Sequence, residues 1–134
     1  MGQSCCKEKT LKILLYADGA GITQIAGLAL DQRIQGFTTN PSLMRSACIT
    51  DYEAFAKEIL KIVPYLPVSF EVFADNFNAM EKQAYKIASW GGNVYVKIPI
   101  TNSLGESTIP IIGRLSQFGV KVNVTAVMTR EQIR

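Results

Sequence analysis

The sequence contains no histidine among its 134 residues. This absence excludes histidine-based catalytic triads from the chain and argues against a zinc site, because imidazole is a common zinc ligand. Acid–base chemistry in this chain therefore depends on Asp, Glu, Lys or Tyr side chains, and we expect no metal.

Cysteine is scarce, and the three cysteines are Cys5, Cys6 and Cys48. An odd number with two adjacent members fits neither a disulfide framework nor a metal-ligand spacing, so we interpret them as reduced thiols. The opening "MGQSCC" is similar to a lipidation signal, but Cys6 stands where that signal needs Ser or Thr. We therefore expect no lipid anchor.

Long apolar runs and charge clusters are also missing. No run approaches the roughly 20 residues of a membrane span, and the N-terminus lacks the apolar core of a signal peptide. The net charge of +3 comes without a basic block or interleaved basic and aromatic residues, which argues against a nucleic-acid partner. We expect a cytoplasmic protein with no membrane partner, whose mild charge suits small anionic substrates.

The composition, 48% hydrophobic and 19% charged, is typical of a soluble globular protein of at most one domain. Along the chain, strand-like apolar runs alternate with segments of helical period. The predicted strands cover 11–18, 67–75, 93–100 and 120–127, and one more ends at Thr38, Thr39 and Asn40. The predicted helices cover 22–28, 50–63 and 107–118, run through Met80, Ala84 and Ile87, and begin again at Thr129. This alternation predicts a parallel sheet.

Details of the chain refine this fold. Thr50 and Glu53 have the spacing of a capping box at the start of a helix. Repeated βα units fit a doubly wound sheet or a (β/α)8 barrel, and "DGAGIT" lacks the third glycine that a dinucleotide-binding loop needs. We expect residues 1–10 to be a disordered extension and residues 11–134 to form part of a barrel.

Each predicted strand carries or ends in polar residues, although strands of a parallel sheet are usually apolar throughout. These residues are Asp18, Thr38, Thr39, Asn40, Glu71, Lys97, Asn123 and Thr125. Four of them have a simple structural alternative: Asp18 and Asn40 could cap helices, Glu71 could face solvent, and Lys97 beside Pro99 could mark an edge strand. In a barrel, however, one polar residue per strand near its carboxyl end would surround a single site.

A lysine in such a strand suggests nucleophilic chemistry, because burial lowers the pKa of a lysine amine and favours its neutral form. A neutral amine forms a Schiff base with a carbonyl substrate. With the carboxylates of Asp18 and Glu71 available for proton transfer, the residues predict a lysine-dependent aldolase reaction at Lys97.

Four motifs, in this order, resemble the transaldolase family, in the group of small transaldolases and fructose-6-phosphate aldolases. They are "GFTTNPSLM" (36–44), "VSFEV" (68–72), "VYVKIPIT" (94–101) and "VNVTAVMT" (122–129). The resemblance implies a (β/α)8 barrel, sugar phosphates as substrates, no cofactor, and a place in the pentose phosphate pathway of carbohydrate metabolism.

The resemblance also implies roles for the catalytic residues. Lys97 would attack the carbonyl of a ketose phosphate, and Glu71 would move protons through a water held by Thr125. Asp18 would take a proton from the C4 hydroxyl, so that the C3–C4 bond breaks and an aldose phosphate leaves. The three-carbon unit would stay on Lys97 until an acceptor aldehyde arrives.

The same resemblance implies the substrate-binding residues. Asn40 and Asn123 would hydrogen-bond the dihydroxyacetone unit, and Thr38 and Thr39 would form the polar rim beneath it. The aldolase branch tends to carry glutamine where this chain has Glu71, which favours transfer of the unit over simple cleavage.

The sequence supplies five βα units, whereas a closed barrel of this type has eight and typically about 250 residues. In the family, the serine and arginine that bind the substrate phosphate lie on later strands. We expect a partial barrel whose open strand edges favour a homo-oligomer, and a poor catalyst on its own. A non-catalytic sugar-phosphate-binding fragment is the alternative.

Overall fold

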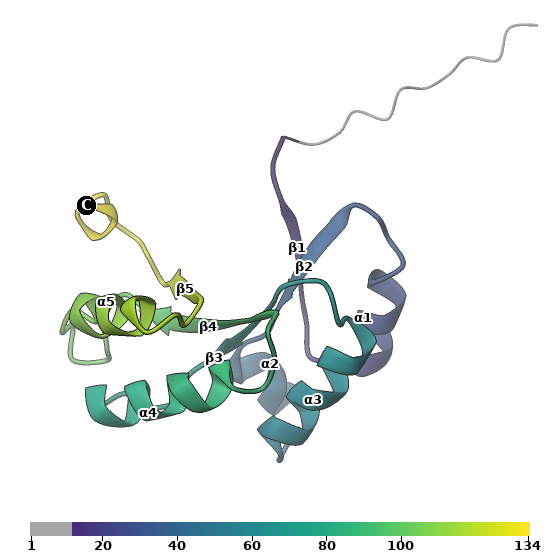
Figure 1. Ribbon diagram of the computed structural model, residues 1–134, viewed down its shortest axis with the longest axis horizontal. Helices are drawn as coiled ribbons and strands as arrows, with labels where there is room; N and C mark the ends of the chain where they lie inside the picture. The colour runs from purple at the N-terminus through teal and green to yellow at the C-terminus, as the bar shows by residue number, and fades with distance from the viewer. Residues whose placement is uncertain (1–11) are drawn as a thin grey trace, which may run out of the picture.

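The computed structural model describes residues 12–134. The extension predicted for residues 1–10 lies outside these residues. The strands are β1 (Leu15–Asp18), β2 (Ile34–Thr38), β3 (Val68–Glu71), β4 (Val94–Pro99) and β5 (Val122–Thr125). The helices are α1 (Ile22–Leu28), α2 (Pro41–Ser46), α3 (Tyr52–Ile62), α4 (Phe77–Ala88), α5 (Ile109–Gln117) and the single 3₁₀ turn η1 (Glu131–Ile133). Figure 1 shows these elements along the chain.

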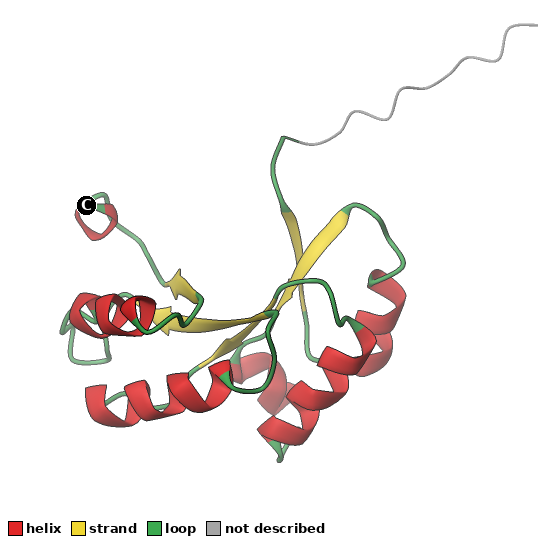
Figure 2. Cartoon of the chain, viewed as in Figure 1, coloured by secondary structure: helices red, strands yellow, loops and turns green. Residues whose placement is uncertain are grey.

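The five strands form one parallel sheet in the order β1-β2-β3-β4-β5. Each new strand therefore joins the same edge of the sheet, as in a barrel, whereas a doubly wound sheet reverses direction part-way. The sheet curls, and the helices lie along its convex side (Figure 2). This arrangement confirms the prediction of a (β/α)8-type fold with five βα units.

Alternation along the strands separates the core from the concave face. On β4, Val94, Val96 and Ile98 are buried and belong to one core cluster with helical residues, including Met80 of α4 and Leu115 of α5. The residues between them on β4 point to the opposite, concave side, because successive side chains of a strand alternate. The polar residues of the strands thus lie away from the apolar core.

Several predicted boundaries differ from the structure. The first strand begins at Leu15 instead of residue 11, since residues 12–14 stand exposed before the sheet. The third strand ends at Glu71, the fifth covers only Val122–Thr125, and the predicted helix from Thr129 is limited to the turn η1. Within residues 12–134, no helix is long and apolar enough to cross a bilayer.

The predicted capping box at the start of α3 is wrong. Asp51, not Thr50, is the N-cap, and its Oδ1 accepts a hydrogen bond from Ala54 N at 2.9 Å. The carboxylate of Glu53 instead pairs with Lys57 and Lys86. Because Asp is at least as good an N-cap as Thr, the shift by one residue has a simple local cause.

Candidate active site

Lys97 lies on the concave side of β4, and two groups contact its amine. Nζ donates a hydrogen bond to the backbone oxygen of Thr39 at 3.1 Å and lies 3.5 Å from Glu71 Oε2. The side chains of Lys97 and Glu71 are 12% and 18% exposed. Shielding of this degree strengthens the interaction between the two charges relative to one in open water.

The strand register brings the predicted residues into rows. Glu71 pairs with Lys97, and Lys97 pairs with Asn123, so three neighbouring strands contribute one side chain each to the same row. Thr125 pairs with Pro99, one inward-facing step further along the strands. Asn123 and Thr125 are two residues apart on β5, so their side chains share one face of the strand.

Asp18 lies apart from this row. It is the last residue of β1, it is exposed, and its register partner is Thr38 on β2. Two further strands, β2 and β3, separate β1 from the strand of Lys97. Among the described residues no hydrogen bond or ion pair joins Asp18 to Lys97, so the structure does not bring these two groups into contact.

The residues that follow β2 begin helix α2 and also include candidate site residues. Asn40 is the N-cap of α2, with Oδ1 accepting from Leu43 N at 2.9 Å, and Pro41 is the first helical residue. The helix-capping interpretation of Asn40 is therefore confirmed. Its Nδ2 group is the part of the side chain that the cap does not use.

Thr38 and Thr39 differ in direction because they are successive residues. Thr38 pairs with Ser69 and belongs to the concave face, whereas the Thr39 side chain is fully buried and donates to the backbone oxygen of Ser69 at 3.3 Å. Thr39 meets Lys97 through its carbonyl oxygen. A role for either side chain in substrate binding stays a prediction.

Sequence reasoning missed Tyr52, the first residue of α3. Its hydroxyl donates to the backbone oxygen of Glu71 at 3.0 Å and is hydrogen-bonded to the Thr39 side chain. Burial raises the pKa of Tyr52 well above its ordinary value. Tyr52 thus contacts the same two residues, Thr39 and Glu71, that contact the amine of Lys97.

The ring of Tyr16, the register partner of Gly36 on β1, explains why a glycine occupies position 36. A Cβ atom at position 36 would lie 2.2 Å from Cε1 of Tyr16. The tyrosine ring therefore covers the concave side of β2 at this residue, and a side chain there would displace it.

Comparison with known proteins agrees with this geometry. The family model described as "Transaldolase/Fructose-6-phosphate aldolase" matches residues 15–134. The chain belongs to the transaldolase/fructose-6-phosphate aldolase family. The matched range contains every candidate site residue, and it covers all five strands of the sheet.

Three curated relatives of this family illustrate the similarity, and each is named "Probable transaldolase". The chain is 39% identical over 112 residues to the one from Dehalococcoides mccartyi, and 36% identical over 117 residues to one from Streptococcus agalactiae. It is 33% identical over 111 residues to the one from Roseiflexus. These matches cover 83%, 87% and 83% of this chain but 50%, 52% and 49% of the relatives, so the chain spans about half their length.

The described residues of this family member also form clefts. One of about 390 Å³ lies on the concave side and is lined by Tyr16, Ser69, Tyr95, Val122, Asn123 and Val124. This cleft includes Asn123, the register partner of Lys97, and it is the one we associate with the site. Between residues 12 and 134, His, Cys, Asp and Glu side chains form no group of three that could hold a metal ion.

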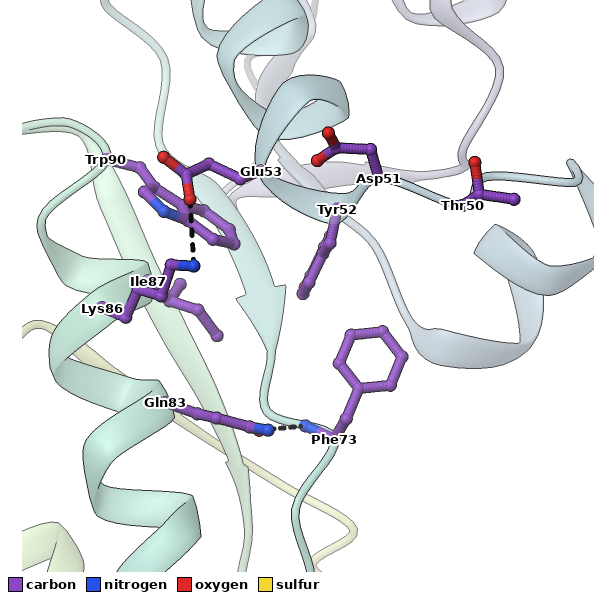
Figure 3. A pocket seen from close by; sticks show the side chains of 9 residues that line it. All are labelled: Thr50, Asp51, Tyr52, Glu53, Phe73, Gln83, Lys86, Ile87 and Trp90. Carbon is purple, nitrogen blue, oxygen red and sulfur yellow. Dashed lines mark hydrogen bonds and ion pairs between the residues drawn. The ribbon is translucent and has the colours of Figure 1, made fainter.

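A larger cleft of about 540 Å³ lies between α3 and α4 in the helical layer (Figure 3). Its polar groups already serve structural contacts. Gln83 Oε1 accepts from the backbone of Phe73 and Ala74, and Glu53 pairs with Lys86. Because this cleft lies in the helical layer, whereas Lys97 lies on the concave side of the sheet, we assign the cleft to packing between the helices and not to the chemistry.

Proposed function

We propose that the chain contributes the Schiff-base lysine of a transaldolase, which transfers a dihydroxyacetone unit from a ketose phosphate to an aldose phosphate. The observation that supports this most is the position of Lys97, with its amine 3.5 Å from Glu71 Oε2 on the concave face of a partial barrel. Family membership supplies the reaction class. The proposal includes sugar phosphates as substrates, a cytoplasmic location and no cofactor.

The first steps form the Schiff base. The neutral amine of Lys97 attacks the C2 carbonyl of the ketose, and the resulting carbinolamine loses water. Glu71 is the one carboxylate within 4 Å of this amine among the described residues, so it is suited to accept and return the protons of these steps. A water held by Thr125 would connect Glu71 to the carbinolamine.

Bond cleavage follows. Asp18 removes the proton from the C4 hydroxyl, the C3–C4 bond breaks, and its electron pair moves into the iminium group to give an enamine on Lys97. The aldose phosphate leaves, and an acceptor aldehyde takes its place. Asn40 and Asn123 would hold the hydroxyl groups of the three-carbon unit. Since Asp18 makes no described contact with Lys97, this role requires a substrate that bridges between them.

Simple aldol cleavage, as in the fructose-6-phosphate aldolases of the same family, is the second candidate function. The carboxylate at position 71 favours transfer, because the aldolase branch tends to carry glutamine there. A fragment that binds sugar phosphates without catalysis is the third, and it is an outcome of the experiment below.

Borohydride trapping tests the proposal. The 134-residue chain is incubated with fructose 6-phosphate or dihydroxyacetone, reduced, digested and analysed by mass spectrometry. We expect a three-carbon adduct on Lys97 that is absent in Lys97→Met. Lys121→Met is the matched control, because Lys121 lies just before β5 and donates to the backbone oxygen of Gly92, away from Glu71.

The alternatives predict different results. An adduct from fructose 6-phosphate that an added aldose phosphate removes supports transfer, whereas an adduct that water alone discharges supports cleavage. A folded chain without any adduct on Lys97 would contradict both enzymatic candidates and favour the non-catalytic fragment.

A further inference from the structure

A hydrogen bond joins two strands that are not neighbours and passes across the concave side of β4. Asn123 on β5 donates from Nδ2 to Ser69 Oγ on β3 at 3.1 Å, and the strand that carries Lys97 lies between them. The curl of the sheet allows this contact, because it brings side chains of alternate strands toward each other.

Ser69 is 1% exposed, so water does not compete effectively for its hydroxyl. It lies two residues before Glu71 on the same face of β3, and its register partner Tyr95 lies two residues before Lys97. Ser69 is thus placed one inward-facing step below the row of Glu71, Lys97 and Asn123. The proposed function gives Ser69 no role.

The hydrogen bond to Ser69 fixes how the side-chain amide of Asn123 is oriented toward a ligand. An asparagine amide has a donor group, Nδ2, and an acceptor, Oδ1. The bond to Ser69 uses one of the two Nδ2 protons and fixes the orientation of the amide, so that Oδ1 is its acceptor for a molecule beside Lys97. An acceptor oxygen at that place favours a ligand that brings a hydroxyl group to it.

We propose that Ser69 is a positioning residue that fixes the amide of Asn123, so that the site selects donors with a hydroxyl on the carbon beside the carbonyl. This inference rests on the proposed function, since it requires a carbonyl compound at Lys97. A site built to hydrogen-bond a substrate hydroxyl disfavours analogues that lack it, because its own polar group is left unpaired.

The first test is a competition between hydroxyacetone and acetone, in which a methyl group replaces the hydroxymethyl group. The two are mixed in equal amounts with the chain, reduced with borohydride, and the ratio of the two adducts on Lys97 is measured. We expect the wild-type ratio to favour hydroxyacetone and Ser69→Ala to lower it about tenfold. Both adducts come from one sample, so partial unfolding cancels from the ratio.

Two further variants test whether Ser69 acts through Asn123. Ser116→Ala removes an exposed hydroxyl on α5 and should leave the ratio unchanged. In an Asn123→Ala background, Ser69→Ala should cause no further change, because the residue through which it acts is gone. A tenfold change that persists in that background, or an unchanged ratio in Ser69→Ala alone, would overturn the inference.

A second measurement does not depend on any reaction at Lys97. Hydrogen exchange of the Asn123 side-chain amide, followed by NMR without a donor, should become about tenfold faster in Ser69→Ala. Equal exchange rates would overturn the positioning role whatever Lys97 does. A protected amide together with no adduct from either donor would support the positioning, overturn the donor selection and contradict the proposed Schiff-base function.

Discussion

The surroundings of Glu71 suit this residue to proton transfer in the candidate site. Its carboxylate lies 3.5 Å from Lys97 Nζ, and its backbone oxygen accepts from Tyr52. We expect Glu71→Ala to slow formation of the Lys97 adduct about 100-fold, since general acid–base groups typically contribute that much. Quenched-flow borohydride trapping measures this rate.

Glu58→Ala is the matched control, because Glu58 is an exposed glutamate on α3. Circular dichroism should show that both variants stay folded. If folded Glu71→Ala formed the adduct as fast as the wild-type chain, Glu71 would have no part in proton transfer.

Gly36 offers a residue-scale test of packing on the concave face. The Cβ atom of Gly36→Ala would meet the Tyr16 ring at 2.2 Å, so the ring must move. We expect a loss of about 1–2 kcal/mol in the free energy of unfolding, measured with urea. In a Tyr16→Ala background the same substitution should cost much less. Equal costs in both backgrounds would show that the ring does not occupy this space.

At the level of single residues, the relative placement of three candidate residues could be predicted from the sequence, whereas their roles stay predictions. The alternation of strand side chains places Lys97, Glu71 and Asn123 on one face, and the register puts them in one row. The sequence did not reveal the Ser69–Asn123 bond or the contact of the Thr39 carbonyl with Lys97. Both depend on the curl of the sheet and on side-chain conformations, which no residue pattern encodes.

At the scale of helices and strands, the apolar period predicted where most elements lie but not where they end. Most helices and strands were predicted from their apolar period, but α2 was not, and short strands ended before their apolar runs did. Val72, for example, is buried and apolar, yet β3 ends at Glu71. Burial alone cannot distinguish a strand residue from a loop residue that packs on the same core.

The cap of α3 provides an element-scale prediction. Asp51→Ala removes the acceptor of Ala54 N and should lower the free energy of unfolding by about 1 kcal/mol. Thr50→Ala should change it by less than about 0.5 kcal/mol, as for an ordinary surface substitution. Urea unfolding of the two variants decides between these caps, and a larger loss for Thr50→Ala would restore the capping box.

Tyr52 predicts how the docking of α3 responds to alkaline pH. The fold raises the pKa of this hydroxyl, so its neutral form is favoured in the folded chain. The stability contribution is complete below the unfolded pKa of about 10 and is lost as the pH rises above it, by up to about 1.4 kcal/mol per pH unit for one group. Tyr52→Phe removes this contribution to the pH dependence.

The measurement is urea unfolding of wild type and Tyr52→Phe between pH 8 and 11, taken as a difference so that other tyrosines and the lysines cancel. We expect the stability of the wild-type chain to fall more steeply above about pH 10 than that of the variant. Parallel curves would mean that the Tyr52 hydroxyl ionises as easily in the folded chain as in the unfolded one.

On the scale of the whole molecule, β1 and β5 are the edges of the sheet, and each pairs with a single neighbour among the described strands. Leu15 and Tyr16 on β1 and Val124 on β5 are large apolar residues that stay exposed. Such edges favour pairing with another chain.

We therefore expect the sedimentation of the purified chain to depend on concentration, as for a self-associating protein. Val124→Lys should shift the equilibrium toward the monomer by placing a charge on the edge strand. A monomer at every concentration in the wild-type chain would contradict association through these edges.

The global topology was the most predictable feature, because βα repetition with one handedness of crossover leaves few arrangements of a parallel sheet. Parallel pairing follows from it, whereas the strand order and the single face covered by helices were implied by the resemblance to the transaldolase family. What repetition does not determine is the distance between residues at opposite edges, and Asp18 on β1 is the residue for which this distance matters.

The aromatic cluster between α3, α4 and β3 gives the chain a built-in optical reporter. Trp90 is the one tryptophan in the sequence, and its ring lies 5.1 Å from Tyr52 and 5.7 Å from Phe70. Its Nε1 is buried without a hydrogen-bond partner among the described residues. Emission from this indole, which is packed against two aromatic rings, is expected to shift to the red when the helical layer separates from β3, even while the strands remain paired.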